Sequence, residues 1–124
     1  MAAYARFMGT EGDIPVPGMK EKLSPAMAAF VQAGFANALD YDDTGSRGHP
    51  GASIFPAVLS LASRLGASGR EVLAALVAGY EVNDRVARAT LPSPACYARV
   101  HANGSIQAIG VAVACGRLMK LGMD

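Results

Sequence analysis

The sequence contains little charge, few aromatic side chains and only two cysteines. Charged residues make up 17% of the 124 residues and aromatic residues 6%, and tryptophan is absent. In soluble domains about a quarter of the residues are usually charged, so the surface of this chain is expected to be unusually apolar. The formal net charge is +1, and no basic run is interleaved with aromatic residues. The electrostatic pattern of a nucleic-acid-binding protein is therefore missing, and we expect no nucleic-acid partner.

Long apolar runs are also missing. The longest, around residues 72–80 and 106–115, fall well short of the roughly 20 residues that cross a membrane. The N-terminus lacks the charged start and long apolar core of a signal peptide. We therefore expect a cytoplasmic protein without a membrane partner. Cys96 and Cys115 lack the spacing of a metal site, so we interpret them as a loop thiol and a buried core residue.

Apolar residues, in contrast, make up 52% of the chain, and its mean hydropathy is +0.26. Two interpretations follow from this excess. Either the chain assembles into a homo-oligomer, or it is a piece of a larger protein whose other parts cover its apolar surface.

Helical patterns dominate the chain after Ser24, and no segment is a convincing strand. Ser24 and Pro25 supply an N-cap and a first-turn proline. Gly66 is a C-cap, and Ser68 with Glu71 forms a capping box. Four helices are predicted, over residues 25–41, 52–65, 69–90 and 104–121, with Gly122 as a cap of the last.

The predicted fold class is all-α: a closely packed bundle of about four main helices, part of a larger helical domain. Residues 1–22 contain several glycines and prolines, so we expect an irregular N-terminal segment there and the helical domain at 23–124. Small residues recur every four positions in the last helix, which predicts that another helix packs closely against that stripe. The stripe consists of Gly104, Ala108, Ala112 and Gly116.

Three carboxylates, Asp40, Asp42 and Asp43, follow the first predicted helix in the stretch LDYDDTGSRGHPGAS. Carboxylates are disfavoured at the negative end of a helix dipole, which makes a purely structural role less favourable. Three interpretations stay open. The cluster is a solvated loop, or it performs acid–base or orienting chemistry in which Asp40 holds a histidine or a lysine, or it binds a divalent metal. The pattern of an EF-hand is not present.

The two histidines of the chain each precede a predicted helix. His49 stands before Pro50, and His101 lies in the stretch Arg99-Val100-His101-Ala102-Asn103-Gly104-Ser105. Histidine moves protons near neutral pH, and helix starts favour anions. The cation of Arg99 and the polar groups of Asn103 and Ser105 suit a polycarboxylate, so we predict that these three residues bind substrate.

Four segments in this order resemble the MmgE/PrpD family, which includes 2-methylcitrate dehydratase and cis-aconitate decarboxylase. They are EKLSPAMAAFVQAGFANALDYDDT, HPGASIFPAVLSLA, GASGREVLAALVAGYEV and YARVHANGSIQAIGVAVACGRLMKLG. The resemblance implies an all-helical N-terminal domain, followed in the family by a smaller α+β domain, with the active site between them. It also implies cofactor-free lyase chemistry on small di- and tricarboxylates, with no metal. Asp40, His49 and His101 would be the catalytic residues.

This chain departs from the family pattern at three positions. Ala102 and Asn103 stand where the family commonly has proline and threonine, and Gly45 stands where a histidine often follows the DDT triplet. These departures leave the substrate and the reaction open. By the same resemblance we expect the family's second domain to lie outside this chain, which would then be a fragment of the helical domain that is inactive alone. The alternative is a non-catalytic helical module that self-associates or completes a partner subunit.

Overall fold

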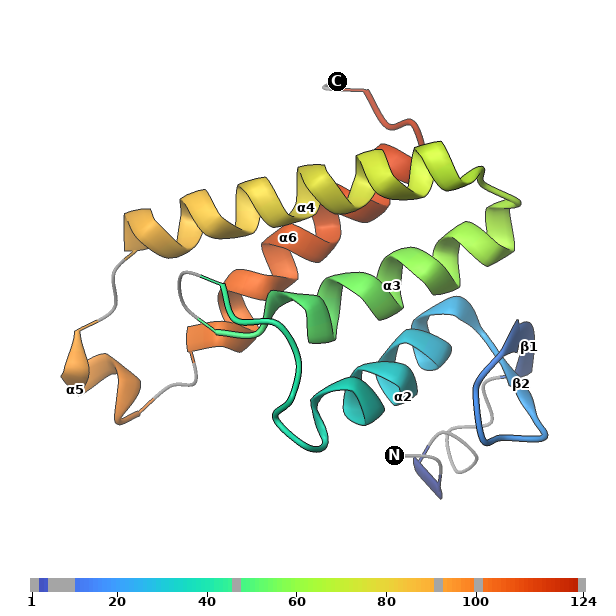
Figure 1. The fold of residues 1–124 in the computed structure, drawn as a ribbon, viewed down its shortest axis with the longest axis horizontal. Coiled ribbons are helices and arrows are strands. Elements are labelled where there is room, and N and C mark those ends of the chain that lie inside the picture. Colours follow the sequence, from blue (N-terminus) through green and yellow to red (C-terminus); the bar gives the residue numbers. More distant parts are fainter. Residues whose placement is uncertain (1–2, 5–10, 46–47, 91–92, 100–101, 123–124) are drawn as a thin grey trace.

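A computed structural model of the chain describes residues 3–4, 11–45, 48–90, 93–99 and 102–122. These ranges form packed helices and one small antiparallel sheet, so the predicted all-α class is confirmed (Figure 1). In chain order the elements are β1 (Glu11–Pro15), β2 (Lys22–Leu23), α2 (Pro25–Asn37), α3 (Pro50–Leu65), α4 (Gly69–Thr90), α5 (Pro94–Tyr97) and α6 (Ala102–Leu118).

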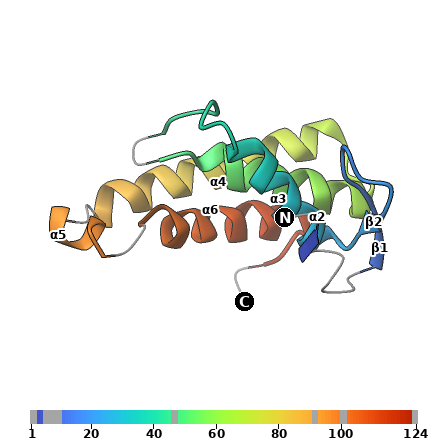
Figure 2. The same ribbon diagram turned by 90° about the horizontal axis from the view of Figure 1, so that it is seen from below.

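Helix α3 lies between α2 and α4, and α6 lies on one side of these three helices (Figures 1 and 2). The main core forms where α3, α4 and α6 meet, around Ile54, Val58, Ala75 and Ala114. A second core joins β1 and β2 to α2, and its buried residues include Ile14, Leu23 and Val31. Burying an isoleucine, leucine or valine side chain of these cores contributes about 1.5–3 kcal/mol.

The predicted caps of three helix ends are confirmed. The hydroxyl of Ser24 accepts a hydrogen bond from the backbone N–H of Met27 at 3.4 Å. Gly66 ends α3 with a φ of 64°, in the left-handed region. The Glu71 carboxylate accepts from the Ser68 backbone N–H at 2.8 Å, and the Ser68 hydroxyl accepts from the Glu71 N–H at 3.3 Å. This reciprocal pair satisfies two N–H groups that a helix start otherwise leaves open.

Several predicted boundaries are wrong. Helix α2 ends at Asn37 rather than at residue 41, because the chain turns at Asp40, whose φ is 52°. Helix α6 ends at Leu118, and Lys120 with a φ of 55° closes it in place of Gly122. The segment after α4, expected to be a loop, contains the four-residue helix α5 with Ser93 as its N-cap.

The expectation that no segment is a strand is also wrong. Strand β1 lies in the N-terminal segment predicted to be irregular, and it pairs with β2 in a register that shifts between Glu11 and Ile14. Gly12 allows this close approach, because a Cβ there would overlap the backbone of Leu23. The sheet is stabilised by packing on α2 rather than by its own length. The division of the chain at residues 22 and 23 into two regions stays a prediction.

Close helix packing occurs, but not at the predicted stripe. A Cβ on Gly79 of α4 would lie 2.8 Å from the Cβ of Ala114, and one on Gly110 of α6 would lie 2.9 Å from the Cβ of Asn83. These two glycines therefore mark the crossing of α4 and α6. The predicted stripe of Gly104, Ala108, Ala112 and Gly116 lies away from this crossing, and its first three members are exposed.

Within the described ranges, no helix combines the length and apolar character that crossing a bilayer requires. Both cysteines in these ranges are free. Cys96 is exposed on α5, whereas Cys115 is half-buried in α6, where burial raises the pKa of its thiol.

Candidate active site

Asp43 anchors the connection between α2 and α3 at two points. Its Oδ1 accepts from the backbone N–H of Gly51 at 3.0 Å, in the first turn of α3. Its Oδ2 accepts from the phenol of Tyr80 on α4 at 2.9 Å. The sequence placed this carboxylate at the unfavourable end of the first helix. The structure places it at the positive N-terminal end of the next, where a negative charge is stabilising.

This anchor changes the expectation that the start of α3 attracts an anionic ligand. The N-cap residue, His49, makes no side-chain cap hydrogen bond, and Asp43 supplies the carboxylate from eight residues earlier. A Cβ on Gly51 would overlap the Asp43 carboxylate, so glycine is required for this approach. Burial, and then the hydrogen bond to Asp43, raises the pKa of the Tyr80 phenol well above its usual range.

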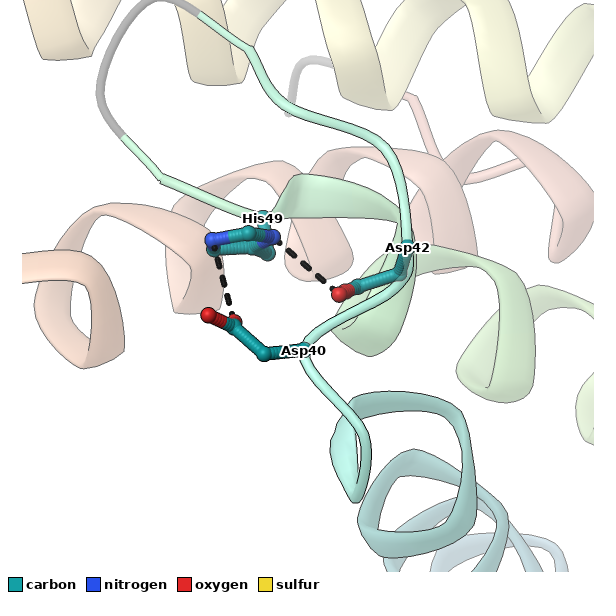
Figure 3. A group of neighbouring side chains, drawn as sticks. All are labelled: Asp40, Asp42 and His49. Atoms are coloured by element: carbon teal, nitrogen blue, oxygen red, sulfur yellow. Dashed lines mark ion pairs between the residues drawn. The ribbon is translucent and has the colours of Figure 1, made fainter.

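The imidazole of His49 lies between two carboxylates of the same connection (Figure 3). Its Nδ1 is 3.1 Å from Oδ1 of Asp42, and its Nε2 is 3.4 Å from Oδ1 of Asp40. The Asp42 side chain is 11% exposed, whereas that of Asp40 is 79% exposed. Asp40 and His49, two of the predicted catalytic residues, are therefore neighbours, and Asp42 is a third member that the prediction left out.

The backbone of Asp40 explains its position. Its positive φ is a conformation that aspartate tolerates better than most non-glycine residues. The turn also gives the Asp40 N–H a hydrogen bond to the carbonyl of Asn37 at 3.1 Å. Asn37, the last residue of α2, donates from its side-chain amide to both oxygens of Asp42 at 3.4 Å. The end of α2 thus holds both carboxylates beside His49.

Asp40 and His49 line a cavity of 690 Å³ between α2, α3 and α6. Helix α6 contributes Gly104 from its first turn and Gln107 from its second. The Ser53 hydroxyl of α3 donates to the Gln107 side-chain oxygen at 2.6 Å. Both helix starts that carry a histidine in the sequence therefore supply residues to the same cavity. The full lining is Phe30, Ala33, Gly34, Asn37, Ala38, Asp40, His49, Ala52, Ser53, Gly104 and Gln107.

Of the other predicted site residues, the two that the structure describes, Arg99 and Ser105, do not line this cavity. His101 lies outside the described residues, as does the side chain of Asn103, whose backbone belongs to α6. Arg99 is exposed in the turn before α6, and Ser105 is exposed on α6, next to the lining residue Gly104. Their assignment as substrate-binding residues stays a prediction.

Besides Asp42, sequence reasoning missed three polar groups that line the cavity. Asn37, Ser53 and Gln107 all line the cavity, and each lies on a helix face without a recognisable motif. Only the position of Ser53, four residues after His49 and thus on the same helical face, could have indicated one of them.

One donor from each of Asp40, Asp42 and His49 lies within 4.8 Å of the others, and this is the single such group in the described part of the chain. Two carboxylate oxygens and an imidazole nitrogen are ligands that divalent metals accept. The site predicted from the sequence did not include a metal. The alternative of a divalent ion at the acidic cluster therefore has a defined location, which metal titration would test.

The chemistry available at this cavity is proton transfer. An imidazole within reach of one largely shielded carboxylate and one exposed carboxylate has the parts of a general base with an orienting acid. His49 is the only basic side chain among the described residues of the lining, so the cavity as described holds one proton-transfer group and little positive charge.

Comparison with known proteins supports one assignment. The family model for the MmgE/PrpD N-terminal domain matches residues 1–124. Searches of curated proteins and of solved structures each find no match to the chain.

Proposed function

The chain belongs to the MmgE/PrpD family, and on that premise we propose that it forms one wall of a lyase site for small di- and tricarboxylates. The observation that carries the proposal is the contact of His49 with Asp40 in a cavity to which both histidine-bearing helix starts contribute. The reaction class is elimination or decarboxylation next to a carboxylate, without a cofactor.

In the proposed elimination, Nε2 of His49 removes a proton from the carbon beside a substrate carboxylate. The electron pair of that C–H bond moves into the carboxylate and gives an enediolate. As the double bond forms, the C–O bond on the neighbouring carbon breaks. The hydroxyl group leaves as water with a proton supplied by His101. Asp40, exposed at the cavity, exchanges protons with the Nε2 side of the imidazole.

We further propose that the chain alone turns over slowly. A developing enediolate needs positive groups or hydrogen-bond donors aimed at its oxygens, and removing one such donor typically costs 10²–10³ in rate. The described lining offers the imidazole of His49 and the amides of Asn37 and Gln107, without lysine or arginine. A second wall, from a partner domain or another subunit, would supply the missing positive charge.

The first test is turnover of 2-methylcitrate or cis-aconitate by the purified chain, followed by alkene absorbance. We expect little or no conversion. Conversion at the rate of a complete lyase would contradict the proposal that a second wall is needed.

The second test is binding, measured by amide shifts in NMR during titration with citrate. Shifts centred on Ser53, Gly104 and Gln107 would support a carboxylate site in the cavity. His49→Gln should abolish them, and Asp13→Asn, a change at an exposed ion pair with Arg64, should not. Shifts elsewhere, or none at millimolar citrate, would exclude this cavity as the site.

A second function is favoured by one observation, the exposed apolar face of α3 and α4. Leu73 and Val77 are 65% and 69% exposed, and Phe55 is 44% exposed beside them. Together with Leu76 and Tyr80 they line a groove of 500 Å³. A non-catalytic helical module would use this face to self-associate or to complete a partner subunit. Light scattering tests this: a monomer at high concentration would exclude self-association.

A further inference from the structure

We infer that Asp42, rather than Asp40, is the positioning residue that fixes the ring of His49 and selects its tautomer. This deepens the proposed function, because it names the group that makes Nε2 the reactive nitrogen. The inference rests on the burial, support and direction of the two carboxylates.

Asp42 has the environment of an orienting group. Its side chain is 11% exposed, and the side-chain amide of Asn37 donates to both of its oxygens at 3.4 Å. Asp40 is 79% exposed on a backbone turn, with its carboxylate open to solvent. A carboxylate that is held and shielded keeps a neighbouring imidazole in one orientation, whereas a solvated one exchanges its contacts with water.

The two ring nitrogens of His49 also have different surroundings. Its Nδ1 is buried, lies 3.1 Å from Oδ1 of Asp42, and has no hydrogen-bond partner of good geometry. The distance from Nδ1 to Oδ1 of Asp42 is that of a hydrogen bond, so a bond from Nδ1–H to this carboxylate lacks only alignment. With the proton on Nδ1, Nε2 is the acceptor, and it faces Asp40 on the cavity side (Figure 3).

The two candidate roles predict opposite tautomers of neutral His49. Orientation by Asp42 favours the Nδ1–H form, and orientation by Asp40 through Nε2 favours the Nε2–H form. The imidazole ¹⁵N shifts distinguish these forms, and only two histidines are present. His101→Gln assigns the signals.

The experiment measures the tautomer ratio of His49 at alkaline pH in the full chain and in Asp42→Asn, with Asp40→Asn and Asp13→Asn as comparisons. We expect Nδ1–H to dominate in the unmodified chain. In Asp42→Asn the ratio of Nδ1–H to Nε2–H should fall about tenfold, as for the loss of one hydrogen bond. In the other two variants it should change by less than about twofold.

An Nε2–H form in the unmodified chain, or an unchanged ratio in Asp42→Asn, would overturn the assignment. If Asp42→Asn does not fold, the unmodified chain decides alone, since Nδ1–H supports Asp42 and Nε2–H excludes it. The measurement uses no substrate. A chain with the expected tautomer that fails to bind citrate would therefore keep this positioning and lose the proposed function.

Discussion

Tyr80 on α4 donates from its phenol to Oδ2 of Asp43 over 2.9 Å, although 37 residues separate the two in the chain. The same carboxylate accepts from the N–H of Gly51 through its other oxygen. One side chain thus joins the loop, the start of α3 and the middle of α4. The position of His49, two residues before Gly51, depends on this junction.

We expect Tyr80→Phe to lower the free energy of unfolding by about 1–2 kcal/mol, because the hydrogen bond to a charged group is lost while the ring stays. Urea denaturation measures the change. Tyr41→Phe is the matched control, since Tyr41 is 95% exposed and its variant should differ from the unmodified chain by less than about 0.5 kcal/mol. Equal effects of the two variants would contradict the anchoring role.

The raised pKa of Tyr80 also predicts a pH dependence. The folded state keeps the phenolic proton to higher pH than the unfolded state, in which tyrosine ionises near pH 10. Stability from this group is therefore complete below about pH 10 and falls as the pH rises further. The difference in unfolding free energy between the unmodified chain and Tyr80→Phe should shrink above that pH. A difference that grows with pH would show the opposite linkage.

Gly51→Ala tests the close approach of Asp43 to α3. The new Cβ would overlap the Asp43 carboxylate and come within 2.6 Å of the Tyr80 hydroxyl oxygen. Because the loop has to move, we expect a loss of about 1–3 kcal/mol in unfolding free energy. Gly69→Ala, at the start of α4, meets no atom within 4 Å and serves as the control. A stability loss shared by both variants would point to a general effect of alanine at helix starts.

The crossing of α4 and α6 gives a matched pair of substitutions within one helix. In Gly110→Ala the Cβ would lie 2.9 Å from the Cβ of Asn83, whereas in Gly116→Ala the nearest atom is 3.7 Å away, on Leu121. We expect Gly110→Ala to destabilise by about 1–3 kcal/mol and Gly116→Ala to stabilise by about 0.5–1 kcal/mol. Thermal and urea unfolding would measure both. Stabilisation by both would mean that the helices separate easily at Gly110.

Acid should loosen the start of α4. Hydrogen bonds from the Ser68 backbone and hydroxyl, and then the ammonium group of Lys120, lower the pKa of Glu71 from 4.5 to about 2. The folded state therefore holds the carboxylate ionised to lower pH than the unfolded state does. The contribution of the Glu71 carboxylate to the stability of the fold is therefore complete above pH 4.5 and is lost as the pH falls toward 2. In this window, Glu71→Gln should lose less stability than the unmodified chain. Parallel acid unfolding curves would contradict this.

Local features of the fold were predictable from the sequence because they depend on neighbouring residues. Ser24, Gly66 and the pair Ser68 and Glu71 act within one helical turn, so their caps are found where the sequence placed them. The prediction that another helix packs against the stripe on α6 was wrong for the opposite reason, because it depends on residues far apart in the chain. A repeat of small residues shows which face permits close packing, but the crossing of α4 and α6 decides which face is used.

The site was predictable in part. A histidine at a helix start and a nearby aspartate indicated His49 and Asp40, and the structure brings them together. The separate roles of Asp42 and Asp43 depend on burial and on contacts with Asn37, Gly51 and Tyr80, which adjacent carboxylates in a sequence do not reveal. The β1–β2 sheet was missed because its pairing depends on packing against α2 rather than on strand length.

The anchor at Asp43 has a consequence for chain length in the loop. Asp43 is fixed to the start of α3, and after it Gly45 donates its N–H to the carbonyl of Gly48 at 2.8 Å. Lengthening a flexible loop costs only about 0.6 kcal/mol for each doubling of its length. Insertions of a few residues between Gly45 and Gly48 should therefore be tolerated without displacing the cavity wall.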